Sequence, residues 1–225
     1  MKSEYVHLYV STLHFSDPRR IAEYQSQLRD WIHGNVSLCE KSLFIFDEVD
    51  KMPSSVMNAI KPFIDHYDSL EGVDYRHSIF IFLSNLGSSD IAQKALEYYE
   101  AGKKRESIKL EEVEELLMAG AFNEEGGLRM SDLISNHLVD HFIPFLPLER
   151  RHILLCIQDY AQEMKIYLSE GDVEAIAELL QYFPRHNPIY SSSGCKRVAH
   201  KTALYVSTKI DNERQLLEHD LSDEL

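Results

Sequence analysis

Cysteine and tryptophan are scarce in this sequence of 225 residues, which holds three cysteines and one tryptophan. The cysteines, Cys39, Cys156 and Cys195, are too few and too widely spaced for a disulfide-rich scaffold or a zinc cluster. No apolar run approaches the length of a transmembrane helix, so we expect no membrane span in this chain. Met1 is followed at once by charge and a β-rich run, which predicts that no signal peptide precedes it.

Positive charge is also in short supply. The sequence has 23 Lys and Arg residues against 37 Asp and Glu residues, for a net charge of -14. A surface that binds nucleic acid needs an excess of Lys and Arg, so we expect no nucleic-acid partner. The hydrophobic content of 44% is enough for one substantial globular domain, or for a domain with a small lobe.

One short apolar run ends abruptly in two carboxylates. Leu43 to Phe46 predicts a strand buried on both faces of a parallel sheet, and Asp47 and Glu48 follow it directly. Ligands of such sheets lie beyond the carboxyl ends of the strands, as in a Walker B element. There Asp47 would hold Mg²⁺ through water and Glu48 would orient the attacking water of phosphoryl transfer. The alternative, a strand that ends in Asp-Glu for structural reasons alone, stays open because short motifs match by chance.

A second apolar run strengthens the nucleotide hypothesis. Ile79 to Leu83 predicts another buried strand, which ends in Ser84 and Asn85. An uncharged amide at a strand end can hydrogen-bond both a phosphate oxygen and the lytic water. Two strands that both end in polar groups suited to one phosphate are much less expected by chance than either strand alone.

The first 149 residues predict an α/β unit with a parallel sheet. Tyr5 to Val10 is a short β-rich run, followed by a helix that Pro18 begins and Gly34 ends. Pro53 begins a second helix whose apolar side extends to Tyr67. The order of strand, helix, strand, helix, strand predicts right-handed crossover connections within one parallel sheet.

The following segments complete the predicted unit. Lys103 to Arg105 is interpreted as a solvated loop between two helices, and Gly126 and Gly127 mark a break. The predicted helices are Ser88 to Tyr99, Leu110 to Phe122 and Leu133 to Phe142, and a last short strand is predicted over Phe142 to Glu149.

From Arg150 the pattern is helical, so we place a domain boundary between residues 149 and 150. Residues 150–211 predict a small helical lobe with helices over Ile153 to Met164 and Asp172 to Tyr182, and a third that begins near Gly194. In the second helix, Val173, Ile176, Leu179 and Leu180 are expected to face inward. Residues 212–225 predict a charged, frayed tail.

With these elements placed, the sequence resembles the torsins, a divergent branch of the AAA+ ATPases related to the Clp/HSP100 proteins. The resemblance spans nearly the whole chain. It rests on the stretches YVHLYVSTLHF, LRDWIHGNVS, LFIFDEVDKM, AIKPFIDHYD, GVDYRHSIFIFLSN, GKKRESIKL, HLVDHFIPFLPLE, YFP and SGCK. It implies an incomplete AAA+ parallel sheet with crossover helices, followed by a small α-helical subdomain.

The resemblance also implies roles for individual residues and ATP with Mg²⁺ as cofactors. Asp47 and Glu48 correspond to the Walker B pair, Asn85 to sensor 1, and Gly194, Cys195 and Lys196 to the sensor-2 motif. Lys196 near the start of the last helix could then reach phosphate oxygens, whereas without the resemblance it is an ordinary surface lysine.

The torsin resemblance further implies that Cys156 could pair with Cys195 in an oxidising compartment and link nucleotide sensing to redox state. Two buried thiols are the alternative, because pairing cannot be judged without Cα distances.

The sequence departs from AAA+ ATPases in lacking a Gly-rich phosphate loop before Tyr5 to Val10. In the AAA+ order, the strand that feeds this loop lies between the sensor-1 strand and the strand near Phe142, so its loss would leave an unpaired slot in mid-sheet. We therefore expect the downstream part of a longer product, or an incomplete gene model, and no activity from this chain alone.

A second departure is shared with torsins. Where Clp-like relatives have an Asn-Arg pair, the arginine finger, this chain has His137 and Leu138. The resemblance implies that a membrane-anchored activator of similar fold supplies the arginine in trans, with self-assembly as a further interaction. The loop Thr12 to Pro18 lacks the Gly-aromatic-Val-Gly form that unfoldases use to grip polypeptide, so Phe15 is expected to pack in the interior.

Two short motifs suggest a location. Ser222 to Leu225 is similar to the KDEL-type retrieval signal, and Asn35-Val36-Ser37 is an N-glycosylation sequon that torsins share. Together with the resemblance they favour the lumen of the endoplasmic reticulum or the nuclear envelope.

Three functions follow from these observations. The first is an ATP·Mg-dependent AAA+ ATPase that remodels proteins. The second is a non-catalytic truncated form that acts as an assembly partner or decoy. The third, a helical adaptor with an accidental carboxylate pair, is disfavoured by the Asn85 and Gly194-Cys195-Lys196 matches.

Overall fold

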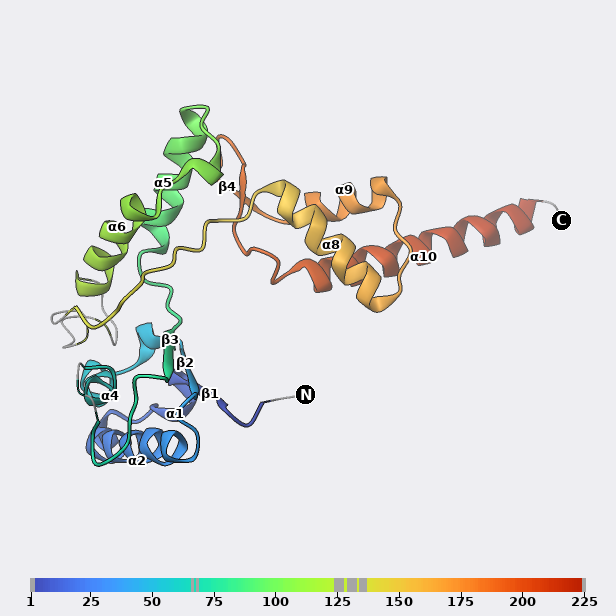
Figure 1. The fold of residues 1–225 in the computed structure, drawn as a ribbon. Coiled ribbons are helices and arrows are strands. Elements are labelled where there is room, and N and C mark those ends of the chain that lie inside the picture. The colour runs from blue at the N-terminus through green and yellow to red at the C-terminus, as the bar shows by residue number, and fades with distance from the viewer. Residues whose placement is uncertain are drawn as a thin grey trace. The chain divides into compact units, whose positions relative to one another are not determined.

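The computed structural model in Figure 1 describes residues 3–223 except 66, 68, 124–127, 129–132 and 134–136. The chain divides into two compact units, Met1–Phe145 and Leu146–Leu225. The predicted boundary, between residues 149 and 150, falls slightly further along the chain. The first unit holds a parallel sheet with helices and the second is mainly helical, which confirms the predicted fold class.

The first unit is built on three parallel strands in the order β1-β2-β3. The strands are β1 (Val6–Val10), β2 (Leu43–Asp47) and β3 (Ile79–Phe82). Val6 pairs with Leu43, and Leu43 pairs with Ile79, so the three strands run in register. Their carboxyl ends therefore lie at the same edge of the sheet.

One face of this sheet is aromatic and buried. Phe44 and Phe46 of β2 are 0% exposed, and they stack on Phe80 and Phe82 of β3. The helix α2 (Ile21–Leu38) lies along this face, with its only tryptophan, Trp31, in ring contact with Phe44. The buried residues of α2 recur every four positions, as an amphipathic helix requires: Tyr24, Leu28, Ile32 and Val36.

Among the described residues, the opposite face of the sheet is less well covered than the aromatic face. Leu8 of β1 is 56% exposed, and Ile79 and Ile81 of β3 are 59% and 39% exposed. Leu43 and Ile45 of β2 are half-buried, so the prediction that Leu43 to Phe46 is buried on both faces is wrong. The prediction of a buried strand over Ile79 to Leu83 is wrong as well. Side chains alternate between the two faces of a strand, and only the aromatic side meets α2.

Helix α2 continues four residues past Gly34, where the prediction ended it. Glycine weakens a helix interior by about 1 kcal/mol relative to alanine. Val36, one turn after Ile32, is 3% exposed and continues the buried stripe, and its burial offsets that cost. A short 3-10 helix, η1 (Pro18–Arg20), precedes α2, with the Asp17 carboxylate accepting the Arg19 N–H at 2.9 Å.

The single helix predicted after Pro53 is two short helices, α3 (Ser54–Met57) and α4 (Lys61–Ile64). Pro62 has no N–H to donate to the carbonyl four residues earlier, so the helix cannot pass through it without a break. Tyr67, expected on the apolar side, is exposed. A 3-10 turn, η2 (Val49–Lys51), connects β2 to this region.

The next two predicted helices are confirmed as α5 (Ser88–Glu100) and α6 (Leu110–Asn123). They pack against each other, and Lys94 pairs with Glu112 at 3.0 Å. Lys103 and Lys104 between them are exposed, as the solvated-loop interpretation predicts, and a short 3-10 helix, η3 (Arg105–Ser107), follows.

The segment before the second unit differs from its prediction. The break at Gly126 and Gly127 lies outside the described residues, as does much of the helix predicted from Leu133. His137 to Phe142 is not helical, and no strand forms over Phe142 to Glu149. Pro144 and Pro147 cannot donate to a strand ladder, and Glu149 forms only an isolated bridge with Tyr190 of the second unit.

The second unit contains three helices among its described elements: α8 (Arg150–Met164), α9 (Glu170–Glu178) and α10 (Val198–Asp223). A two-stranded antiparallel sheet of β4 (Tyr182–Phe183) and β5 (Tyr190–Ser191) lies between α9 and α10 in the chain. The core consists of Ile153, Ile157, Val173, Ile176, Ala177, Leu180 and Val198. Leu179, which was expected to face inward, is 41% exposed.

Helix α10 extends to Asp223, where a frayed tail was predicted. Its first half is tied to α9 through Asp172, a carboxylate that is almost fully buried. Asp172 accepts hydrogen bonds from Lys209 at 2.9 Å, from Tyr205 at 2.8 Å and from the backbone of Ser169 at 3.0 Å. The Lys209 ammonium, followed by these donors, holds the pKa of Asp172 well below its ordinary value, so the carboxylate stays charged.

His7 on β1 generates a testable prediction. Its ring stacks on Phe44 and meets Trp31 edge-on, and its Nε2 is buried without a hydrogen-bond partner among the described residues. Burial lowers the pKa of His7 below its ordinary value of 6.5. The unfolded chain then binds the proton more tightly, so this contribution to stability is complete above pH 6.5 and is lost as the pH falls below it.

We expect His7→Phe to remove this part of the acid sensitivity, which for one proton is at most about 1.4 kcal/mol per pH unit. Unfolding would be followed between pH 7.5 and 5 by fluorescence of the single tryptophan, Trp31, which reports on the first unit alone. Equal pH slopes for the two proteins would contradict this role of His7.

Candidate active site

Polar side chains gather where the three parallel strands end. Ser11 and Thr12 follow β1, Asp47 ends β2 with Glu48 next to it, and Asn85 comes shortly after β3. Because β2 is the central strand, its two carboxylates lie between the ends of the other two strands. This edge is where parallel sheets bind their ligands.

Glu48 adopts a left-handed backbone conformation, with φ 55° and ψ 42°. For a residue other than glycine this conformation costs about 1–2 kcal/mol. Residues in such strained conformations cluster at functional sites. The N–H of Glu48 donates to Asp47 Oδ1 at 2.9 Å, which fixes one carboxylate against the backbone of the other residue. Both side chains are half-buried.

Backbone contacts join the ends of β2 and β3. The N–H of Val49 donates to the carbonyl of Leu83 at 3.1 Å, and the N–H of Asn85 donates to Asp50 Oδ1 at 3.4 Å. Burial raises the pKa of Asp50, but the Lys51 ammonium at 3.0 Å and the Asn85 N–H outweigh it and lower the pKa below its usual value. A charged Asp50 thus holds the Asn85 segment beside the carboxylate pair.

Two contributors to the site, Ser11 and Thr12, were missed in the sequence analysis. Ser11 Oγ donates to the backbone carbonyl of Asp47 at 2.8 Å, and the Thr12 hydroxyl donates to Glu48 Oε2. The signal was available, because Ser11 and Thr12 follow β1 as Asp47 and Glu48 follow the core of β2. The same rule about strand ends, applied to the first strand, would have found them.

The sensor-2 candidates lie in the second unit, in the turn before α10. Gly194 has φ +54°, a conformation that glycine adopts readily, and its carbonyl accepts a hydrogen bond from Ser191 Oγ at 3.0 Å. Lys196 is exposed and lies two residues before Val198, the first residue of α10. The helix was predicted to begin near Gly194, so it begins slightly later than predicted.

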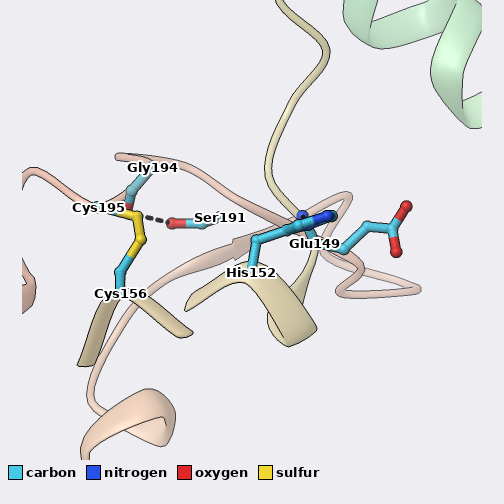
Figure 2. The surroundings of a disulfide bond; sticks show 6 residues. All are labelled: Glu149, His152, Cys156, Ser191, Gly194 and Cys195. Atoms are coloured by element: carbon cyan, nitrogen blue, oxygen red, sulfur yellow. Dashed lines mark hydrogen bonds between the residues drawn. A yellow bond between two sulfur atoms is a disulfide. The ribbon is translucent and has the colours of Figure 1, made fainter. Parts of the chain in front are cut away.

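A disulfide joins Cys195 of this turn to Cys156 of α8, as Figure 2 shows. The two Cα atoms are 6.1 Å apart, within the range that a disulfide spans. The same figure shows Glu149 and His152 at the start of α8, where the backbone N–H of Glu149 donates to His152 Nδ1 at 3.0 Å. The Gly194-Cys195-Lys196 turn is thus covalently attached to the core helix of its unit.

Comparison with known proteins gives matches near both ends of the chain. The family model described as Torsin matches residues 1–46, and the model of the Torsin-1A C-terminal domain matches residues 148–205. A "Torsin-like protein" of Caenorhabditis elegans is 47% identical over 211 residues, which cover 91% of this chain. The chain belongs to the torsin family.

The chain spans 58% of the length of this torsin relative. Torsin-family membership is consistent with the partial AAA+ fold described above. The activity of the whole protein, its substrates and its partners are therefore matters for proposal.

The carboxylate oxygens at the strand ends suit a magnesium site that is completed by water and substrate phosphates. Among the residues that the structure describes, no group of three or more His, Cys, Asp or Glu side chains could hold a metal ion by itself. Magnesium in nucleotide sites uses one or two carboxylates, several waters and the substrate phosphates, and Asp47 is a carboxylate of that type. Its Oδ1 already accepts the Glu48 N–H, which orients the carboxylate.

Other residues singled out in the torsin sequence have clear positions. Phe15 is 6% exposed and contacts the rings of Tyr9 and Tyr24, which confirms its packing role.

Asn35 of the sequon lies in α2, and its side-chain amide donates to the Trp31 carbonyl at 2.7 Å. The last two residues of the retrieval-like tail lie outside the described residues. No described helix is both long enough and apolar enough to cross a membrane.

The disulfide yields a prediction for the second unit. Replacing Cys156 and Cys195 together by serine should lower the free energy of unfolding of this unit by about 2–4 kcal/mol, because the cross-link no longer restricts the unfolded chain. Far-UV circular dichroism would follow this loss, and Trp31 fluorescence of the first unit should remain unchanged. Cys39→Ser is the matched control, since Cys39 is a free thiol. Equal thermal unfolding of the double variant and the control would contradict the prediction.

Proposed function

We propose that this chain is the downstream part of the ATPase module of a torsin-like protein that binds ATP·Mg²⁺ and uses its hydrolysis to remodel proteins. The observation that carries the proposal is the meeting of Asp47, Glu48 and Asn85 at one edge of a parallel sheet. Each has the chemistry that phosphoryl transfer requires, and the order of strands brings all three to the same place.

The roles follow from side-chain chemistry. Asp47 would hold Mg²⁺ through water, and the ion, when bound, would neutralise charge on the phosphates. Glu48 would act as the general base that orients the attacking water. Asn85 would hydrogen-bond that water and a phosphate oxygen, since its amide is both a donor and an acceptor. Its side chain is exposed and therefore accessible to a ligand.

Lys196 is proposed as the sensor-2 lysine, whose positive charge suits nucleotide phosphates. An exposed lysine is a mobile point charge that suits this task. The disulfide and the Ser191 hydrogen bond support this role because they restrict the turn that carries Lys196.

The printed sequence holds no phosphate loop, and we propose that a strand and helix of the same polypeptide, preceding β1, provide it. Two observations favour this. The apolar face formed in part by Leu8, Ile79 and Ile81 is exposed, whereas parallel sheets are normally covered on both faces. β3 is an edge strand of the described sheet, with one side open for a further strand.

An arginine that stabilises the transition state would come from an activator in trans. The place where Clp-like proteins carry this arginine is occupied by His137 and Leu138, and Leu138 is buried with its N–H bonded to the Leu133 carbonyl at 2.8 Å. We propose a membrane-anchored activator of similar fold as this partner, with assembly between torsin chains as a further interaction.

We also propose the lumen of the endoplasmic reticulum or the nuclear envelope as the location. The Cys156–Cys195 disulfide supports an oxidising compartment, because disulfides rarely persist in the cytosol. The Asn35 sequon and the sequence of the last four residues are consistent with the same address.

A second candidate function is a non-catalytic assembly partner or decoy for torsin chains and their activators. In that case the strand-end residues would be retained without turnover.

The general-base role of Glu48 predicts the effect of Glu48→Gln in the polypeptide that includes a phosphate loop. Activator-stimulated ATP turnover should fall by at least about 100-fold, while ATP·Mg²⁺ still binds. Glu40→Gln is a matched control, because Glu40 precedes β2 at the opposite end of the strand and is exposed. Unchanged turnover of Glu48→Gln with the activator present would remove Glu48 from the base role.

Isothermal titration of this purified chain with ATP·Mg²⁺ separates the two candidate functions. The non-catalytic function predicts no micromolar binding, because the phosphates have no cradle of backbone N–H groups. Micromolar binding that Asp47→Ala weakens would defeat the decoy function and favour the ATPase.

A further inference from the structure

The turn between α5 and α6 carries a local excess of positive charge in an acidic chain. Residues 101–109, which we name the basic turn, hold four cationic side chains and one carboxylate, whereas the whole chain has a net charge of -14. The cationic residues are Lys103, Lys104, Arg105 and Lys109, and the carboxylate is Glu106. The two helices that the turn joins pack against each other (Figure 1). The candidate active site makes no use of this cluster.

Hydrogen bonds fix the backbone of the basic turn. Gly102 has φ +67°, a conformation that glycine adopts readily, and the N–H of Lys103 then donates to the Tyr98 carbonyl at 2.9 Å. Further along, Ser107 donates to the Lys104 carbonyl twice, through its N–H at 3.0 Å and its Oγ at 2.6 Å. A turn that is already ordered loses little conformational entropy when a ligand binds to it.

Two lysines of the basic turn keep their charge available to a partner. Lys103 and Lys104 are exposed, and neither forms an ion pair within the described part of the chain. Lys103 Nζ lies 5.1 Å from the centre of the Tyr98 ring. The nearby carboxylate of Glu112 is paired with Lys94 at 3.0 Å and accepts the Tyr98 hydroxyl at 2.9 Å. The Tyr98 ring thus places the Lys103 ammonium without neutralising it.

The surroundings of the basic turn favour a narrow anionic partner over a broad one. Exposed carboxylates lie beside it in the chain, from Glu97 and Glu100 at the end of α5 and from Glu111 in the first turn of α6. A flat anionic membrane would meet these carboxylates together with the lysines, and like charges repel. An extended polypeptide segment can contact the lysines alone.

Apolar side chains are exposed at both ends of the basic turn. Tyr99 is 48% exposed and Leu110 is 44% exposed. They offer apolar contact area beside the two ammonium groups, and tyrosine is among the residues that contribute most to protein interfaces. A partner that matches both features carries apolar residues between its carboxylates.

We propose that the basic turn is a docking site for an acidic polypeptide segment in which Asp and Glu alternate with apolar residues. Lys103 and Lys104 supply the charge, and Tyr99 and Leu110 supply the apolar contacts. This function goes beyond the proposed ATPase, and its test requires neither nucleotide nor a phosphate loop.

The chain itself contains a sequence of the required chemistry, which serves as the probe. Residues 216–225, LLEHDLSDEL, carry four acidic side chains and four leucines. A fluorescein-labelled peptide of this sequence, titrated with the purified 225-residue chain, should show a rise in fluorescence anisotropy. The affinity should fall as salt is added, because salt screens exposed charges. The same peptide with Gln and Asn in place of Glu and Asp should not bind.

Reversing the two charges tests the site. Lys103→Glu combined with Lys104→Glu should weaken binding by at least about 10-fold, since two attractive pairs become repulsive ones. Lys103→Arg combined with Lys104→Arg should retain binding. Lys41→Glu combined with Lys165→Glu is the matched control, because both lysines are exposed and lie outside the basic turn.

Far-UV circular dichroism and Trp31 fluorescence verify that each variant is folded. Lys104→Glu alone is a second variant that leaves the Lys103 contact with the Tyr98 ring in place, and it should also weaken binding. Equal affinity of the unsubstituted chain and the double variant, or equal affinity for the acidic and neutral peptides, would overturn the docking site. Binding to phosphatidylserine vesicles without binding to the peptide would overturn it as well, because the basic turn would then belong to a membrane contact.

Discussion

The parallel register of β1, β2 and β3 is the constraint on which the candidate site depends. Thr12, Glu48 and Asn85 are far apart in the chain, and backbone pairing brings the ends of their strands to one edge. The aromatic face of the sheet stabilises this register, because a slip by one residue would turn Phe44 and Phe46 away from α2. Full burial of one such side chain contributes about 1.5–3 kcal/mol, so the register and the site are stabilised together.

The two faces of the sheet differ sharply. One is closed by α2 and buries a stack of aromatic rings, whereas the other leaves Leu8 and Ile79 more than half exposed. An α/β sheet of this kind is usually covered on both sides, and the free edge of β3 is the place where the proposed phosphate-loop strand would pair. The described part of the chain thus contains groups whose chemistry suits magnesium and water.

The second unit is held together by its own interactions. A disulfide connects α8 to the turn before α10, and the buried carboxylate of Asp172 connects α9 to Tyr205 and Lys209 of α10. These contacts restrict the Gly194-Cys195-Lys196 turn without help from the first unit.

Local patterns in the sequence were sufficient for much of this description. Alternation of strands and helices predicted the parallel sheet, and the rule that ligands lie beyond strand ends identified Asp47, Glu48 and Asn85. The sequence could not show where tertiary packing overrides local helix and strand preferences. Burial of Val36 stabilises α2 beyond Gly34, and apolar residues on the uncovered sheet face are exposed although their pattern predicts burial.

Only the tertiary structure decided that Phe142 to Glu149 forms no strand, because a strand depends on a neighbour that no local pattern reveals. It alone joined Thr12 to Glu48 and Cys156 to Cys195. The sequence by itself determined which chemical groups stand at the strand ends, since residue type and periodicity are local properties. Which of those groups touch was left to the fold, because contacts between distant residues depend on strand order and packing.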